Sequence, residues 1–160
     1  MRRLLWLGVG LLVGCGANKR QRTTKKARYT VGSPGDGWQA QPAGSADQSW
    51  YHPKRSAVIY TSANCGDRYE DGRLADLSTH LTFGIAHGSP LRDETTHLDS
   101  REALIRVYDG QLDGVAVRVG AVVTKKHDCL YDMLYIAPPS TFDGGWTDFV
   151  QVIEGFAVSR

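Results

Sequence analysis

The apolar residues of the chain follow two spacings, and each spacing predicts its own kind of element. Short runs rich in β-branched and aromatic residues predict strands. These runs are Ser49–His52, Ala57–Cys65, Glu102–Tyr108, Val115–Thr124 and Leu130–Ile136. A spacing of three and four residues instead brings Leu74, Leu77 and Leu81 to one side of an amphipathic helix that packs onto the sheet.

Turn-forming residues separate these elements. Pro53–Ser56 predicts an antiparallel hairpin between the first two strands, and Asp109–Gly114 predicts a tight connection between two later strands. Pro138–Pro139 ends the last long strand, because proline lacks a backbone N–H donor. A final helix is then predicted, with Ser140 or Thr141 as its N-cap. The sum is an α+β fold, a mostly antiparallel sheet of about five to six strands packed with two helices.

Residues 1–14 differ from the rest of the chain and have the zones of an export signal: a positive start, a short apolar core and small residues before Cys15. The apolar core at Leu4–Leu12 is too short for a transmembrane helix, which needs ~20 residues. Leu12–Cys15 resembles the lipobox of bacterial lipoproteins. The resemblance implies cleavage before Cys15 and a diacylglycerol anchor on it, and Gly16 in place of Asp implies the outer membrane, on its periplasmic face. An ordinary secretory signal with an incidental cysteine is the alternative.

Charge divides the rest of the chain into a basic segment and an acidic domain. Residues 15–28 carry six cations and no acid, which predicts a lipidated, flexible linker. An alternative is that these cations lie on anionic lipid headgroups. Residues 29–160 contain 11 basic and 17 acidic residues, a formal charge of −6, and their number fits a single globular domain. A domain of that sign is not expected to bind nucleic acid.

A remote resemblance covers this domain. An aromatic start is followed by a turn at Pro34–Gly37, by Trp38, by a meander of strands, and by a terminal helix that carries Asp148–Phe149 and ends at Gly155–Phe156. This order resembles the PsbP-like family of α/β/α sandwiches, and the resemblance implies the fold but no site residue. Cys129–Asp132 is also similar to a theme in uncharacterised lipoproteins of predatory soil bacteria.

The sequence contains few signals of chemistry. Cys65 and Cys129 are the pair that remains if Cys15 carries lipid, and in an oxidising compartment they predict a disulfide; two buried thiols or a reactive pair are the alternatives. The five histidines fall in no metal-binding motif, so we expect no metal and no cofactor beyond the covalent lipid. No serine lies in a known nucleophile motif, and paired aspartates fit turns better than catalysis, so no catalytic residue is predicted.

Trp50, Tyr51 and His52, beside a small polar loop, are the predicted rim for binding a partner. Gly84–Ser100 is predicted to be a loop and is the second place where a partner could bind. Together with the anchor, these features predict a membrane-anchored periplasmic lipoprotein that acts as a non-enzymatic binding or assembly module for a protein or cell-wall partner. The alternatives are an envelope-acting hydrolase with no recognisable motif and a purely structural lipoprotein.

Overall fold

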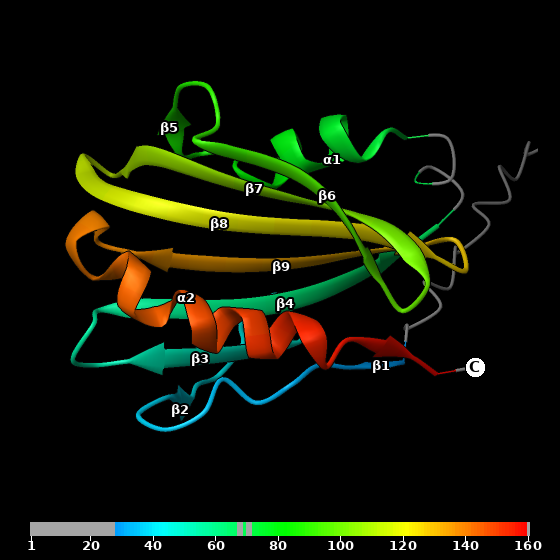
Figure 1. Cartoon of the computed structure of the whole chain (residues 1–160), viewed down its shortest axis with the longest axis horizontal. Helices are drawn as coiled ribbons and strands as arrows, with labels where there is room; N and C mark the ends of the chain where they lie inside the picture. Colours follow the sequence, from blue (N-terminus) through cyan, green and yellow to red (C-terminus); the bar gives the residue numbers. More distant parts are fainter. Residues whose placement is uncertain (1–27, 67–68, 70–71, 160) are drawn as a thin grey trace, which may run out of the picture.

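The computed structural model describes residues 28–66, 69 and 72–159, and among them it contains ten strands and two helices (Figure 1). The strands are β1 (Tyr29–Thr30), β2 (Gln39–Ala40), β3 (Gln48–His52), β4 (Ala57–Cys65), β5 (Ala86–His87), β6 (Arg92–Leu98), β7 (Arg101–Leu112), β8 (Val115–Lys126), β9 (Cys129–Ala137) and β10 (Ala157–Val158); the helices are α1 (Leu74–Leu81) and α2 (Pro139–Glu154). The predicted export signal, Cys15 and the linker up to residue 27 lie outside the described residues.

One antiparallel sheet of eight strands dominates the described part of the chain. Seven of its strands lie in the order β2-β3-β4-β9-β8-β7-β5, and β6 also pairs with β7. Five of the six strands with five or more residues correspond to the predicted runs, the sixth, β6, was not predicted, and the additional strands β2 and β5 have two residues each. A separate pair, β1 and β10, joins the two ends of the described chain. The predicted α+β class with a mostly antiparallel sheet is therefore confirmed.

Three tight turns connect β6 to β7, β7 to β8 and β8 to β9. Each turn has two residues with positive φ: Asp99–Ser100, Asp113–Gly114 and His127–Asp128. Two-residue turns of this kind match the right-handed twist of the strands they join, and Asp, Asn and Gly tolerate the left-handed conformation best. These turns connect long strands directly, and of these β8 and β9 lie in the centre of the sheet.

The two helices cover opposite faces of the sheet, which gives three layers (Figure 1). The face under α2 carries the larger core, in which aromatic side chains of the helix pack on aromatic side chains of β9; its members include Phe142, Phe149, Tyr131 and Tyr135. The other face is covered by α1 through the predicted leucine stripe, and Leu74 and Leu77 contact a smaller cluster on β7, β8 and β9. Among the residues described, no helix is long and apolar enough to cross a membrane.

Two local predictions were wrong. Gly84–Ser100 is not a loop throughout, because it contains β5 and the seven-residue strand β6. The N-cap of α2 is Pro138, which makes no side-chain cap hydrogen bond, and not Ser140 or Thr141. Thr141 instead donates from Oγ1 to the backbone carbonyl of Arg55, which ties the start of α2 to the turn between β3 and β4.

Candidate functional site

The disulfide predicted from the sequence is present between Cys65 and Cys129. These residues face each other at the end of the β4–β9 ladder, where Cys65 ends one strand and Cys129 begins the next. The bond therefore joins the ends of two central strands, at the end of the sheet where the β8–β9 turn lies. Cys129 also lines a hollow at this end of the sheet.

This hollow is a cleft of about 770 Å³ between the start of α1 and the ends of β7, β8 and β9. Its wall combines basic side chains, Arg73, Arg101, Lys125, Lys126 and His127, with the acids Glu102 and Asp128 and the apolar Leu74 and Ala75. Four of the domain's eleven Lys and Arg residues thus line one cleft of an acidic domain. We call it the cationic cleft.

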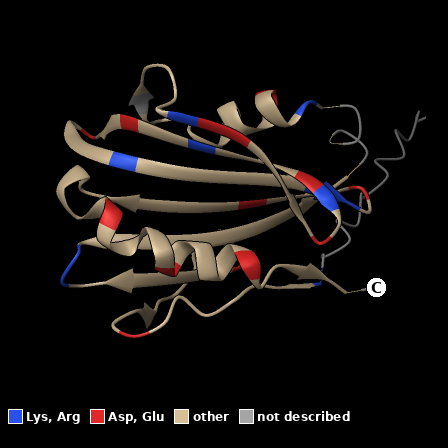
Figure 2. Ribbon diagram, viewed as in Figure 1, with Lys and Arg blue, Asp and Glu red and all other residues tan. Residues whose placement is uncertain are grey.

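The cations of the cleft differ in how far they are already neutralised. Arg73 is 82% exposed and pairs with Asp76, whose hydrogen bond holds the pKa of the guanidinium above its ordinary value. Lys126 donates from Nζ to Oδ2 of Asp99 at 2.6 Å. Arg101 is exposed. Figure 2 shows basic and acidic segments adjoining at this end of the sheet. The cleft therefore combines the exposed Arg73 and Arg101 with Lys126, which is more buried and paired with Asp99.

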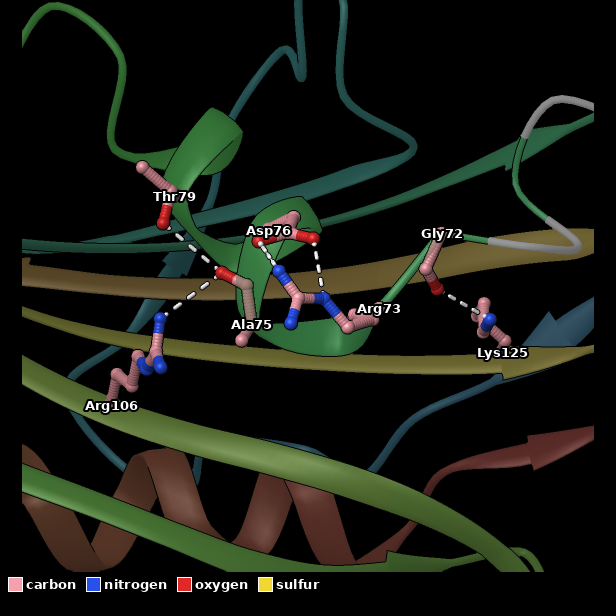
Figure 3. A network of polar contacts seen from close by, with 7 residues as sticks. All are labelled: Gly72, Arg73, Ala75, Asp76, Thr79, Arg106 and Lys125. Atoms are coloured by element: carbon pink, nitrogen blue, oxygen red, sulfur yellow. Dashed lines mark hydrogen bonds and ion pairs between the residues drawn. The ribbon is translucent and has the colours of Figure 1, made fainter.

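Hydrogen bonds from the sheet to the backbone of α1 and of Gly72, just before the helix, hold α1 over the sheet (Figure 3). Lys125 on β8 donates from Nζ to the carbonyl of Gly72 at 2.6 Å, and Arg106 on β7 donates from Nη1 to the carbonyl of Ala75 at 3.1 Å. Thr79 donates to the same carbonyl of Ala75 from within the helix. These contacts set the position of the helix start, which is one wall of the cleft.

Asp99 connects the cleft to the ends of the described chain. Its carboxylate accepts hydrogen bonds from Lys126 Nζ and from the backbone N–H of Val158, and both hold its pKa below the ordinary value, with Lys126 the larger cause. The backbone N–H of Ser159 in turn donates to the carbonyl of Arg28. The first described residue, Arg28, therefore lies at the same end of the molecule as the cationic cleft (Figure 1).

The predicted rim of Trp50, Tyr51 and His52 is not one exposed surface. Trp50 packs against the larger core, and His52 is buried with its ring 5.3 Å from that of Trp38. Tyr51 points to the opposite face of β3, because successive strand residues alternate. The role of these residues in binding a partner stays a prediction.

The cationic cleft was missed in the sequence because its residues are spread over more than fifty positions. The available signal was the short basic run Lys125–His127 near Cys129. The predicted disulfide fixes Cys129 at the end of a strand, so the basic side chains of this run lie close together there. No group of three or more His, Cys, Asp or Glu residues that could hold a metal is found in the described part of the chain.

Solved structures of low sequence identity share this fold. LpqN of Mycobacterium tuberculosis, described as involved in cell envelope biogenesis, has a TM-score of 0.60 and 9% identity, over 88% of each chain. CyanoP, the cyanobacterial PsbP of Synechocystis sp. PCC 6803, has a TM-score of 0.58 and 14% identity, over 94% of this chain and all of that one. PA94 of Pseudomonas aeruginosa, a protein of unknown function, has a TM-score of 0.53 and 12% identity, over 87% of this chain and 88% of that one.

These likenesses support the PsbP-like resemblance at the level of the fold, and a fold does not define an activity. No protein-family model and no curated protein matches the sequence.

Proposed function

We propose that this chain is a lipoprotein, anchored through Cys15 at the periplasmic face of the outer membrane, whose domain is a non-enzymatic binding or assembly module. The observation that carries the binding role is the cationic cleft, which gathers Arg73, Arg101, Lys125 and Lys126 in an otherwise acidic domain. The anchor rests on the lipobox resemblance. That LpqN, a protein of the same fold, is described as involved in cell envelope biogenesis is consistent with an envelope role.

The lining of the cleft favours binding over catalysis. Guanidinium and ammonium groups form charge-assisted hydrogen bonds with carboxylates and phosphates, so the expected ligand is an anionic group of a protein or cell-wall partner. Among the described residues that line the cleft there is no serine, no threonine and no free thiol, because Cys129 is bonded to Cys65. An envelope hydrolase acting here would have to use the carboxylates Glu102 and Asp128, the imidazole of His127 or an activated water.

The anchor is tested by replacing the acylated cysteine. We expect Cys15→Ser to move the protein from the membrane fraction to the soluble periplasm, because the variant has no thiol for a thioether-linked lipid. Mass spectrometry of the wild-type N-terminus should find a processed, acylated Cys15. Retention of the variant in the membrane fraction would contradict lipid anchoring and would leave the cleft proposal untouched.

The cleft is tested by crosslinking the anchored protein in envelope fractions and identifying what co-purifies. Arg73→Gln together with Arg101→Gln removes two exposed cations of the cleft, while Lys54→Gln removes one from the distant β3–β4 turn. We expect the partner recovered with the wild type and with Lys54→Gln to be lost with the double variant. Equal recovery with all three proteins would exclude the cleft as the binding site, and recovery of no partner would favour a purely structural lipoprotein.

A further inference from the structure

A second hollow, of about 210 Å³, lies between the first half of α2 and the strands β7 and β8, beside the start of β6. Trp146 on α2 lies directly against the sheet at Gly120, where a Cβ atom would be 2.6 Å from the indole ring. The absence of a side chain at this position of β8 therefore lets the indole lie low enough to form one wall. The hollow is separate from the cationic cleft and shares no lining residue with it.

Two guanidinium groups stack on aromatic rings in the wall of this hollow. Arg92 on β6 lies 5.3 Å from the ring centre of Trp146, and Arg118 on β8 lies 5.7 Å from that of Phe142. The two rings are themselves 5.4 Å apart. Stacking orients a guanidinium and leaves the N–H groups that are not already hydrogen-bonded directed outward at the edge of its plane.

Each of the two arginines has at least one N–H donor without a hydrogen bond among the described residues. Arg118 gives Nε and Nη2 to the carboxylate of Asp109, while its Nη1 lies 4.0 Å from Asp143. Arg92 gives Nη2 to Glu94 at 2.6 Å, but its buried Nε–H has no acceptor among the described residues. A buried donor without a partner costs free energy, and such a group in a folded protein calls for an explanation.

We propose that this hollow binds a carboxylate carried on a small apolar group, such as the free C-terminus of a peptide that ends in a hydrophobic residue. A carboxylate matches the planar edge of a guanidinium, and the Arg92 side chain, which is 40% exposed as a whole, would have to turn its buried Nε–H toward the hollow to use the carboxylate as the acceptor that it lacks. Leu91, 60% exposed at the rim, and Trp146 offer the apolar contact. The volume admits about one residue, which excludes a long folded segment as the group inserted.

A monoanion fits this hollow better than a phosphate dianion. Glu94 and Asp109 already pair with the two arginines, and Asp143 lines the hollow. These three carboxylates already outnumber the two guanidinium groups, so a second negative charge on the ligand would be repelled more strongly than the first, and the ligand is expected to carry one charge and to be held mainly by hydrogen bonds and apolar contact. The inference goes beyond the proposed function, because it needs neither the lipid anchor nor the cationic cleft.

The test compares two peptides that differ only at the C-terminus. The probes are acetyl-Ala-Ala-Leu with a free carboxylate and the same peptide as its amide, titrated into the isotope-labelled mature chain with Cys15→Ser. We expect the acid to shift the NMR signals of the Arg92 Nε–H and the Trp146 indole N–H saturably, and the amide to bind at least tenfold more weakly. Equal affinity for acid and amide, or binding of neither, would overturn the proposal.

Three variants assign the binding to this hollow. Arg92→Gln should weaken binding of the acid at least tenfold, whereas Arg73→Gln in the cationic cleft should not change it. Asp143→Asn, at a side chain that is 90% exposed and so is not needed for folding, should strengthen binding of the acid and leave the amide unaffected. Unchanged affinity in both Arg92→Gln and Asp143→Asn would show that the peptide binds elsewhere.

Discussion

Asp132 is a carboxylic acid in the middle of the sheet, 6% exposed, on β9. Burial disfavours its charged form and raises its pKa to about 7; the charge of Asp47 acts in the same direction, while hydrogen bonds from Ser62 and Asn64 oppose it. The group therefore takes up a proton in the folded protein at a pH where an exposed aspartate in the unfolded chain is ionised.

This shift makes the stability of the domain depend on pH. The pKa is higher in the folded state than in the unfolded state, so the stabilisation is complete at acidic pH and is lost as the pH rises through about 7. Between pH 5.5 and 8 the free energy of unfolding should fall by on the order of 2 kcal/mol from this group. Asp132→Asn should remove that dependence, as measured by urea unfolding at both values. A variant with the same dependence as the wild type would rule out Asp132 as its source.

The sequence could not separate Asp132 from its neighbours of the same type. Asp128 and Asp132 both look like turn aspartates, and Asp128 does lie in a turn, at φ 61°. Asp132 lies in a buried strand instead, between Tyr131 and Met133, within a run whose apolar residues predict the strand. An acidic residue within such a run was the available signal, because burying an ionised carboxylate on a strand costs free energy.

Arg106 illustrates what holds one element to another. Its guanidinium is largely buried, pairs with Asp93, and donates to the carbonyl of Ala75 in the first turn of α1 (Figure 3). Without it, the helix keeps its leucine contacts with the sheet but loses one fixed point at its start. The effect is expected to be local, because α1 is only eight residues long and such helices depend on tertiary contacts.

Arg106→Met should therefore loosen α1 without unfolding the sheet. We expect the amides of α1 to exchange with solvent faster by a factor that corresponds to about 1–2 kcal/mol, while those of α2 do not change. Hydrogen exchange followed by mass spectrometry measures both helices in one experiment. Arg73→Met is the control, since Arg73 forms an exposed pair with Asp76 that contributes little. Equal protection of α1 in both variants would show that the leucine contacts alone position the helix.

At the scale of elements, the sequence pattern predicted the strands that have a buried apolar face and missed the strands that do not. β4, β7, β8 and β9 were found because their apolar residues are dense. β6 reads Arg-Asp-Glu-Thr-Thr-His-Leu, and of these only Leu98 is buried, so no alternation was visible. It pairs with β7 alone, and an edge strand rich in charge is typical of sheets that avoid further pairing. The cleft was missed for a related reason, because it forms from the ends of elements.

The whole molecule is closed at one end by contacts between distant parts of the chain. The disulfide joins residues 64 positions apart, Asp99 bonds both Lys126 and Val158, and β1 pairs with β10. All of these lie at the end where the cationic cleft opens and where the chain continues toward Cys15. If Cys15 is anchored as we propose, this is the end of the domain from which the linker leads to the anchor.

Loss of the disulfide should therefore weaken the domain as a whole. On the chain-entropy account, closing a loop of this length stabilises the folded state by about 4 kcal/mol, so Cys65→Ser with Cys129→Ser should lower the Tm by roughly 10–15 °C. Calorimetry of the mature protein measures the change, and reductant should lower the Tm of the wild type but not of the double variant. Cys15→Ser should leave the Tm unchanged, because Cys65 and Cys129 form the disulfide without it. Two outcomes together would contradict this prediction: a double variant as stable as the wild type, and wild-type protein from the periplasm in which the thiols of Cys65 and Cys129 can both be titrated. They would mean that the disulfide does not form in the cell and that the β4–β9 ladder alone closes the cleft wall.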